Sequence, residues 1–196
     1  MQGSLFNTET FQIEDGFLSF TPSIFAIEEA KLFFEELLNK TEWRSDTITL
    51  FGKAYKQPRL TALYGFKVYS YSNITMQPLP FTPTLLKIKK HIESITGEEF
   101  NVCLLNLYRD GNDSNGWHAD NEKSLGKNPT IASVSFGDTR MFHLKHNNNG
   151  EKIKLALTHN SLLVMKGETQ HFWKHQIPKT KKSVGPRINL TFRYIK

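Results

Sequence analysis

His118 and Asp120 lie two residues apart in the segment GWHAD, residues 116–120, and both side-chain types are common metal ligands. In an extended segment, residues two apart project from the same face with their Cα atoms about 6–7 Å apart. Both side chains could therefore reach one metal ion. Two histidines and one carboxylate form the facial set that holds Fe(II) and leaves other positions open. A His-x-Asp triplet is common by chance, so this interpretation needs a third ligand and independent support.

Two histidines further along the chain are candidates for the third ligand. His171 and His175 lie in the segment QHFWKH, residues 170–175, within a strand predicted over 171–176. The residue pattern alone does not choose between them. The other histidines of the second half and of the predicted helix are expected to be ordinary surface or edge residues: His91, His143, His146 and His159.

The C-terminal segment PRINLTFR, residues 186–193, has the alternation of a strand with one cationic face. Successive residues of a strand point to opposite faces. The polar face carries Arg187, Asn189, Thr191 and Arg193, and the apolar face carries Ile188, Leu190 and Phe192. Two guanidinium groups inside a barrel are costly unless they meet anions, and a dicarboxylate would satisfy both through bidentate hydrogen bonds. The alternative is a basic edge strand with both arginines in water.

Helices are predicted only in the first half of the chain. Apolar residues at helical spacing over 27–38 follow the start signal Thr21-Pro22-Ser23. A second helix is predicted between Thr82, which can cap it, and Gly97, which can end it, with Pro83 at its first position. Residues 47–72 are typical of hairpins.

After Gly97, short β-rich runs are separated by Asn, Gly and Asp turns, without alternating helices. These runs are 101–108, 130–136, 140–145, 152–157, 161–165, 171–176 and 187–195. The pattern predicts a mainly β (α+β) fold: a double-stranded β-helix, or jelly roll, with the N-terminal helices packed on one face and a substrate-binding hairpin lid. We expect one domain over 1–196, with helices and recognition hairpins in 1–97 and the β-helix core in 98–196.

Composition narrows the class of protein. The chain has 196 residues, a formal net charge of +6, 38% hydrophobic residues and one cysteine, Cys103. Its apolar content suits a packed core and excludes a disordered or collagen-like chain. One cysteine cannot form an internal disulfide or a thiolate zinc cluster, so we expect an intracellular protein, cytoplasmic in a bacterium or nuclear in a eukaryote. No apolar run is long enough to cross a membrane. The positive charge favours polyanionic partners.

Five elements of the sequence together resemble the AlkB family of Fe(II)/2-oxoglutarate-dependent nucleic-acid dealkylases. They are NLY at 106–108, GWHAD at 116–120, IASVSFG at 131–137, His175, and RINLTFR at 187–193. Their order and separation match the family over about residues 47–195. LFGK at 50–53 and PR at 58–59, ahead of Tyr64-Gly65, resemble most closely the branch that repairs double-stranded DNA.

The resemblance implies a metal site and a co-substrate site. His118, Asp120 and His175 would hold Fe(II), which makes His175 the third ligand in place of His171. The co-substrates would be 2-oxoglutarate and O2. Arg187 and Arg193 would clamp the carboxylates of 2-oxoglutarate, and the remaining predicted co-substrate contacts are Asn106, Tyr108, Asn189 and Thr191.

The resemblance also implies that the substrate is alkylated DNA, with duplex favoured and single strands or RNA as further possible partners. It further implies a monomer that does not bind membranes. A base methylated at adenine N1 or cytosine N3 would be flipped into the pocket and hydroxylated on its methyl group. The hydroxymethyl group would then leave as formaldehyde. Tyr71 and His118 would stack the base, Glu122 would meet its cationic ring, and Phe51 would fill the gap left in the duplex. The other predicted substrate contacts are Arg59, Tyr69, Lys181 and Lys182. The alternatives are the same chemistry on RNA or protein, and a catalytically silent nucleic-acid-binding barrel.

Overall fold

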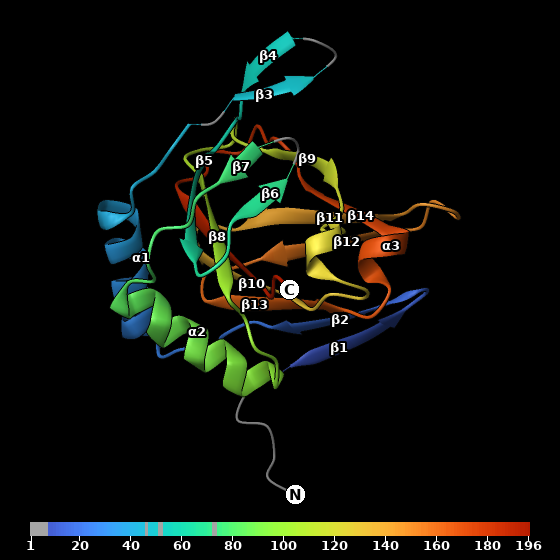
Figure 1. Cartoon of the computed structure of the whole chain (residues 1–196), viewed down its shortest axis with the longest axis horizontal. Helices are drawn as coiled ribbons and strands as arrows, with labels where there is room; N and C mark the ends of the chain where they lie inside the picture. Colours follow the sequence, from blue (N-terminus) through green and yellow to red (C-terminus); the bar gives the residue numbers. More distant parts are fainter. Residues whose placement is uncertain (1–7, 46, 51–52, 72–73) are drawn as a thin grey trace, which may run out of the picture.

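Two antiparallel sheets form the centre of the protein in the computed structural model, which describes residues 8–45, 47–50, 53–71 and 74–196 (Figure 1). The larger sheet has seven strands in the order β1-β2-β13-β10-β15-β8-β5, and the smaller has four in the order β12-β11-β14-β9. This arrangement confirms the mainly β, jelly-roll prediction. The strands are β1 Glu9–Ile13, β2 Gly16–Thr21, β5 Leu60–Gly65, β8 Val102–Tyr108, β9 Asn115–His118, β10 Ile131–Gly137, β11 Arg140–His146, β12 Lys152–Leu157, β13 Ser161–Lys166, β14 Trp173–Ile177 and β15 Arg187–Arg193.

Two helices of 14 residues cover the outer face of the larger sheet: α1, Ile27–Lys40, and α2, Pro83–Thr96. The backbone N–H of Leu85 donates to the Thr82 hydroxyl at 3.2 Å, and Gly97 ends α2 with a φ of 70°. Both predicted ends of this helix are therefore confirmed. The Ile27 side chain is 77% exposed, so the buried face of α1 begins one turn later than the apolar spacing predicts.

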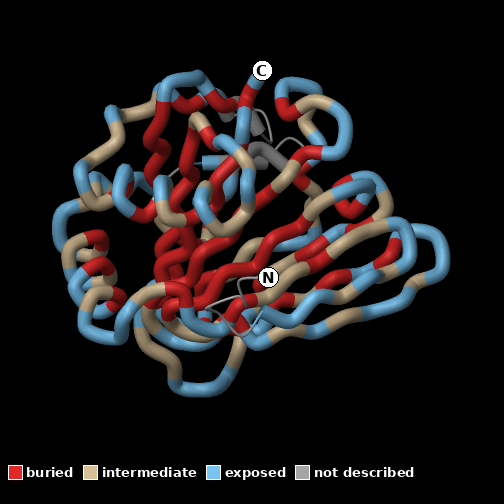
Figure 2. The backbone as a smooth tube through the Cα atoms, turned by 90° about the horizontal axis from the view of Figure 1, so that it is seen from below, coloured by how far each residue is buried: buried red, intermediate tan, exposed pale blue. Residues whose placement is uncertain are grey.

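The core has two layers, which lie on the two faces of β15. Its residues Ile188, Leu190 and Phe192 pack with the helices in the outer layer. The inner layer lies between the sheets and includes Leu104 of β8 and Leu144 of β11. Figure 2 shows the buried stretches running along the strands, with exposed segments at the loops. Because side chains alternate along a strand, the polar residues of β15 must enter the space between the sheets.

One hairpin lies within the predicted hairpin region 47–72, and a second begins in this region and ends just beyond it. β3, Thr47–Leu50, pairs with β4, Lys53–Lys56, and β6, Tyr69–Tyr71, pairs with β7, Ile74–Met76. The β3–β4 hairpin projects from the top of the molecule (Figure 1). Phe51, the predicted wedge, lies outside the described residues. Tyr71 is placed only as the last residue of β6, because the described part of the structure does not include its side chain.

The predicted strand over 171–176 is wrong at its start. The backbone N–H groups of His171 and Phe172 donate to the Glu168 carbonyl at 2.8 and 3.2 Å, which closes a helical turn, α3, Thr169–Phe172. The strand β14 begins only at Trp173. His171 therefore belongs to a different element from His175.

The N-terminal hairpin of β1 and β2 has no counterpart among the predicted elements. β2 pairs with β13 over the register Thr21↔Leu162 to Phe17↔Lys166, which extends the larger sheet beyond the second half of the chain. β5 joins the opposite edge of this sheet by pairing with β8. Strands from both halves of the chain thus build one sheet.

One histidine expected at the surface is buried. His146 is 1% exposed, and its Nε2 atom lies 3.2 Å from Oδ2 of Asp15 in the turn between β1 and β2. Its ring stacks on Phe172 with a centroid distance of 6.0 Å. The prediction of an ordinary surface residue is wrong here, because the unpredicted β1–β2 hairpin covers this position.

Within the described ranges, neither α1 nor α2 has the length and apolar character that a bilayer crossing requires, and the same holds for the short α3.

Candidate active site

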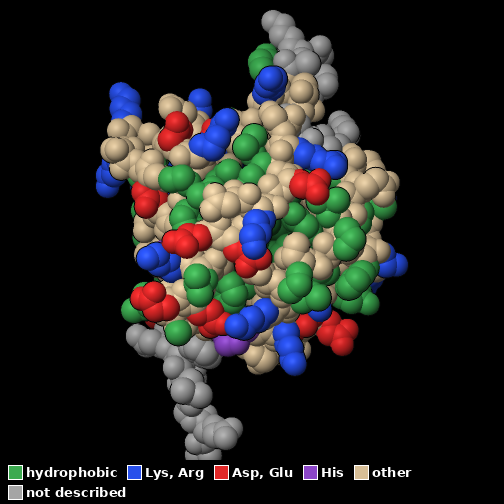
Figure 3. All heavy atoms as spheres, turned by 90° about the vertical axis from the view of Figure 1, so that its left-hand side faces the viewer, with side chains coloured by type: hydrophobic (Ala, Val, Ile, Leu, Met, Phe, Trp, Pro, Cys, Tyr) green, Lys and Arg blue, Asp and Glu red, His purple; other side chains and the backbone are tan. Residues whose placement is uncertain are grey.

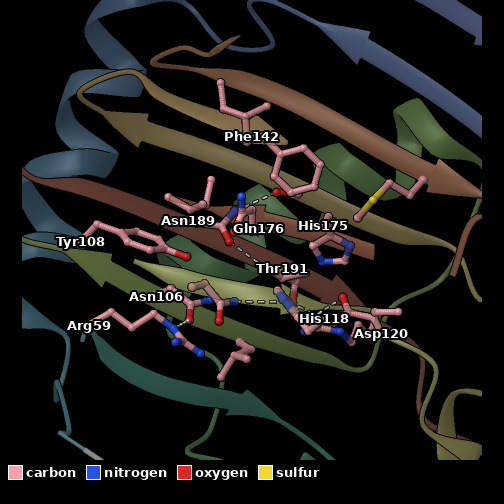
Figure 4. Close-up of a pocket in the computed structure, with 18 of the residues that line it drawn as sticks. Arg59, Asn106, Tyr108, His118, Asp120, Phe142, His175, Gln176, Asn189 and Thr191 are labelled. Atoms are coloured by element: carbon pink, nitrogen blue, oxygen red, sulfur yellow. Dashed lines mark hydrogen bonds and ion pairs between the residues drawn. The ribbon is translucent and has the colours of Figure 1, made fainter. Parts of the chain in front are cut away.

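Three candidate metal ligands meet in the space between the sheets (Figure 4). His118 is the last residue of β9, and His175 in β14 is its Cα partner in the sheet. One ligand-type atom from each of His118, Asp120 and His175 lies within 4.8 Å of the others. The Nε2 atom of His118 is 4.0 Å from Oδ1 of Asp120, and the two imidazole centroids are 4.3 Å apart. Two imidazoles and one carboxylate at this spacing fit Fe(II).

His171 lies away from this cluster. Its ring Nε2 is 2.9 Å from Oδ1 of Asn128, and its side chain is exposed. The helical turn of α3 therefore separates the two histidines that the sequence left as alternatives.

Neighbouring groups orient the three candidate ligands. Nδ1–H of His118 donates to the Gly116 carbonyl at 2.7 Å, so Nε2 carries the lone pair, which accepts from Nδ2 of Asn115 at 3.2 Å in this structure. The backbone N–H of Asp120 donates to Oε1 of Gln170 at 2.9 Å. Phe142 stacks on His175 with a centroid distance of 5.2 Å. Such contacts fix the direction and protonation state of metal ligands.

Burial and charge hold these groups in the protonation state that a metal requires. Burial lowers the pKa of His175 to about 3, with a further contribution from His118. The pKa of His118 is also lowered, mainly by burial. Burial raises the pKa of Asp120, but Arg193 and the two histidines outweigh it, and the pKa is lowered to about 2. At neutral pH the site therefore presents two neutral imidazoles and one carboxylate.

Arg187 is a buried cation with hydrogen-bonding capacity left over. Its side chain is 1% exposed, and Nη2 donates to the Ser135 hydroxyl at 2.8 Å. Nε and Nη1 have no hydrogen-bond partner among the described residues. Burial lowers the pKa of this guanidinium to about 10, so it remains charged at neutral pH. Two free donors on a buried cation that lines the cavity are suited to a carboxylate.

Arg193 has a partner that Arg187 lacks. Its Nη2 donates to Oδ2 of Asp120 at 2.7 Å, and both side chains are 5% exposed. Burial lowers the pKa of Arg193, but Asp120 and Tyr69 outweigh it and raise the pKa. Nε of Arg193 has no partner among the described residues. The two arginines of the motif therefore differ, since one is paired with a candidate metal ligand.

The side-chain amides of Asn106 and Asn189 in the pocket also differ in their hydrogen-bond partners. Nε of Arg59 donates to Oδ1 of Asn106 at 2.7 Å. Asn189 donates from Nδ2 to the Ser133 hydroxyl at 2.8 Å and to the Val134 carbonyl at 3.1 Å, and accepts from the Thr191 hydroxyl at 2.9 Å. The Asn189 amide is thus satisfied within the protein and connects β15 to β10.

A second carboxylate lies at the edge of the metal cluster. Glu122 hydrogen-bonds to the Tyr69 hydroxyl, while its Oε2 atom is buried without a partner among the described residues. Burial and the charge of Asp120 raise the pKa of Glu122. Burial likewise raises the pKa of Tyr69, which stays a protonated donor. An unpartnered carboxylate oxygen in the pocket can accept from a ligand that carries N–H groups or positive charge.

Most of the predicted site residues line one cavity of about 140 Å³. They are Arg59, Tyr69, Asn106, Tyr108, His118, Asp120, Glu122, His175, Arg187, Asn189, Thr191 and Arg193. Lys181 and Lys182 do not line it and are exposed in the loop before β15. Phe51 and the side chain of Tyr71 lie outside the described residues.

The sequence did not single out several residues that support this cavity. Ser133 and Ser135 of β10 bond to Asn189 and Arg187, and their alternation on one strand was the signal that could have found them. Gln170 gave no such signal, since its contact with Asp120 depends on the unpredicted α3. Arg140 of β11 is 2% exposed and lies close behind Tyr108.

Comparison with known proteins assigns this chain to a class of enzymes. The sequence pattern of the 2OG-Fe(II) oxygenase superfamily matches residues 17–193. The solved structure of OsALKBH1 shares the fold, with a TM-score of 0.66 at 19% identity over 95% of this chain and 100% of that chain. Fe(II), with 2-oxoglutarate and O2 as co-substrates, is therefore the chemistry of this class, and the triad supplies donors of the right kind.

Curated relatives narrow the class. The chain is 46% identical over 184 residues to the Bos taurus protein "Alpha-ketoglutarate-dependent dioxygenase alkB homolog 3", which covers 89% of this chain and 64% of that relative. It is 38% identical over 185 residues to the Homo sapiens "DNA oxidative demethylase ALKBH2", covering 88% and 71%. The chain belongs to the AlkB family of 2OG-Fe(II) oxygenases. The chain spans about two thirds of the length of the alkB homolog 3 relatives. The names of these two relatives do not specify duplex or single-stranded DNA.

Proposed function

We propose that this chain removes alkyl groups from N-alkylated bases in DNA, of the 1-methyladenine and 3-methylcytosine type, by oxidising the alkyl carbon so that formaldehyde is released. The observation that carries the proposal is the cavity that combines the His118, Asp120 and His175 cluster with the free donors of Arg187 and the unpartnered oxygen of Glu122. The relative named as a DNA oxidative demethylase supports DNA as the substrate.

In this proposal the triad holds Fe(II), which with 2-oxoglutarate and O2 supplies oxidation of an unactivated C–H bond. Arg187 would give its two free N–H donors to one carboxylate of 2-oxoglutarate, and Arg193, which is paired with Asp120, would hold the other. Tyr108 and Thr191 line the wall between the two arginines, and the Asn106 amide is oriented by Arg59. Asn189 acts by holding Thr191 and β10 in place.

The same cavity explains why a methylated base would be selected. A base inside a duplex cannot reach a buried site, so it must be flipped out at a cost of a few kcal/mol, which is lower where methylation already blocks pairing. Methylation at adenine N1 or cytosine N3 leaves a cationic base. The Glu122 carboxylate, held by Tyr69, would accept hydrogen bonds from such a base and balance its charge.

Contacts with the nucleic-acid backbone are proposed for Lys181 and Lys182, which are exposed before β15. The helix side of the molecule is less suited to a polyanion. There, acidic and basic side chains are interspersed (Figure 3), and Lys87 pairs with Glu29 at 2.5 Å. If these lysines bind phosphates, the affinity for nucleic acid should fall as the salt concentration rises, whatever the base sequence. Phe51 and Tyr71 remain the proposed wedge and stacking residue for a duplex substrate.

We also propose that residues 1–196 act as one dioxygenase domain, as a monomer, inside the cell where DNA is found. The pairing of β2 with β13 and of β5 with β8 supports a single domain, since strands from both halves of the chain share one sheet. Light scattering on the purified chain would test the monomer.

The decisive experiment measures formaldehyde and succinate released from a panel of oligonucleotides, with Fe(II) and 2-oxoglutarate present. The panel pairs 1-methyladenine and 3-methylcytosine in duplex and single-stranded DNA, with methylated RNA and unmodified DNA as controls. Equal amounts of both products from methylated DNA would support the proposal. Efficient turnover of RNA alone would replace DNA with RNA as the substrate, and no release from any nucleic acid would refute demethylation. Asp120→Ala supplies the inactive control.

A further inference from the structure

Arg140 is a fully buried cation outside the candidate active-site cavity. It is the first residue of β11, is 2% exposed, and does not line the cavity. No carboxylate within the described ranges forms an ion pair with it. A buried guanidinium without a carboxylate is costly unless main-chain carbonyls or an aromatic face stabilise it. Arg140 has both kinds of partner.

Three main-chain carbonyls from two loops accept hydrogen bonds from Arg140. Its Nη1 donates to Asp110 at 2.9 Å, and its Nη2 donates to Asp113 at 2.8 Å and to Pro178 at 2.7 Å. The first two carbonyls belong to the loop 109–114 after β8, and the third belongs to the loop after β14. The guanidinium therefore joins two loops that are far apart in the sequence.

The same two loops are in direct contact beyond Arg140. The backbone N–H of Thr180 donates to the Gly111 carbonyl at 2.9 Å, and a Cβ atom at Gly111 would collide with the Thr180 carbonyl. The loop 109–114 also reaches the substrate side, since the N–H of Ser114 donates to the Pro58 carbonyl at 2.9 Å. Residues 179–182, which carry the lysines proposed to bind phosphates, are thus fixed to a loop that Arg140 holds.

Tyr108 connects Arg140 to the co-substrate side. The guanidinium carbon of Arg140 lies 5.5 Å from the centre of the Tyr108 ring, and that of Arg187 lies 5.3 Å from the same ring. A flat guanidinium can stack on the ring and donate to three carbonyls at once, whereas the compact ammonium of a lysine cannot do both.

We propose that Arg140 is a positioning residue that holds Tyr108 against Arg187 and, through the carbonyls of Asp110, Asp113 and Pro178, fixes the lysine loop 179–182 beside the pocket. The co-substrate part of this inference needs only the family's 2-oxoglutarate, while the part concerning the lysine loop rests on the proposed function. Arg140 acts through these groups, because both of its terminal nitrogens are already used.

The test compares Arg140→Met and Arg140→Lys with Lys145→Met, an exposed position on the same strand that loses the same charge. Calorimetric titration of the Mn(II)-loaded protein with 2-oxoglutarate measures affinity without turnover. Arg140→Met should weaken 2-oxoglutarate binding about tenfold, which corresponds to about 1.4 kcal/mol. Arg140→Lys should fall between it and the wild type, and Lys145→Met should match the wild type.

Hydrogen exchange supplies the readout for the loops. In Arg140→Met, exchange should rise together in residues 109–114 and 179–182, while β10 and β15 keep the protection of the wild type. If a folded Arg140→Met or Arg140→Lys variant binds 2-oxoglutarate like the wild type, or if the two loops keep their protection, the inference is overturned. A wild-type chain that binds 2-oxoglutarate but releases no formaldehyde from DNA would refute the proposed function and leave the affinity and exchange comparison intact.

Discussion

Replacing Arg187 with methionine should stabilise the ligand-free protein and at the same time strongly weaken co-substrate binding. The side chain is 1% exposed, and two of its N–H groups have no partner among the described residues. Burial lowers its pKa to about 10, and this shift corresponds to about 3 kcal/mol of unfavourable free energy for the charged form. The folded state carries this cost at every pH below about 10, because the guanidinium is charged there in both folded and unfolded chains.

The gain on substitution is smaller than that cost, because Arg187→Met also loses contacts. The hydrogen bond to Ser135 contributes about 1 kcal/mol, and the stacking on Tyr108 contributes about 0.5–1 kcal/mol. We expect a net stabilisation of about 1–2 kcal/mol, or about 2–8 °C in the melting temperature of a chain of this size. In contrast, two charge-assisted hydrogen bonds to 2-oxoglutarate would be lost, each worth about 1.5–3 kcal/mol, so affinity should fall by at least about a hundredfold.

Arg193→Met is the matched control with the opposite sign. Its ion pair with Asp120 at 2.7 Å joins two side chains that are each 5% exposed. Removing one partner of a buried pair leaves the other charge uncompensated, which costs about 3–5 kcal/mol. Thermal unfolding without metal or 2-oxoglutarate, followed by calorimetry with Mn(II) and 2-oxoglutarate, measures both effects. A lower melting temperature for Arg187→Met would refute the view that this guanidinium is unsatisfied without its ligand.

Three further outcomes follow from the geometry. His175→Ala should weaken Mn(II) binding by more than the roughly 10–100-fold expected for loss of an outer-shell partner, whereas His171→Ala should leave it unchanged; equal losses would contradict the assignment of the third ligand. Between pH 7.5 and 5.5, Mn(II) affinity should change by less than the roughly tenfold expected for a ligand imidazole with a pKa of 6.5, because burial lowers the pKa of His175 to about 3 and also lowers the pKa of His118. Thr82→Ala should lower the melting temperature by about 2–4 °C through loss of the helix cap, with 2-oxoglutarate affinity unaffected.

Local patterns predicted those parts of the fold whose signal lies within one element. The alternation of β15 is the clearest case, since its apolar residues face the helices and its polar residues face the cavity. The cap at Thr82 and the left-handed Gly97 were predictable for the same reason, because capping depends on a few neighbouring residues.

Features that depend on distant pairing could not be predicted. The β1–β2 hairpin is fixed by its register with β13, about 140 residues away in the chain. The burial of His146 follows from that hairpin, because Asp15 in its turn approaches the ring. The helical turn at Thr169 interrupts what the β-rich composition of 171–176 predicted as a strand, since its hydrogen bonds compete with strand pairing.

Arg140 was missed for a different reason. An arginine at the start of a strand is ordinarily a solvated residue, and nothing within β11 indicates that three carbonyls from two loops surround it. The residues of the motif itself were recognisable because burying charge is costly, so two arginines on the inward face of a strand imply anions that meet them. Arg193 finds its anion in Asp120 within the protein, and Arg187 does not. The unpartnered N–H donors of Arg187 therefore indicate a ligand more strongly than the donors of Arg193 that are paired with Asp120. Burying a guanidinium without a partner destabilises the fold, so a bound anion is the reason to expect it there.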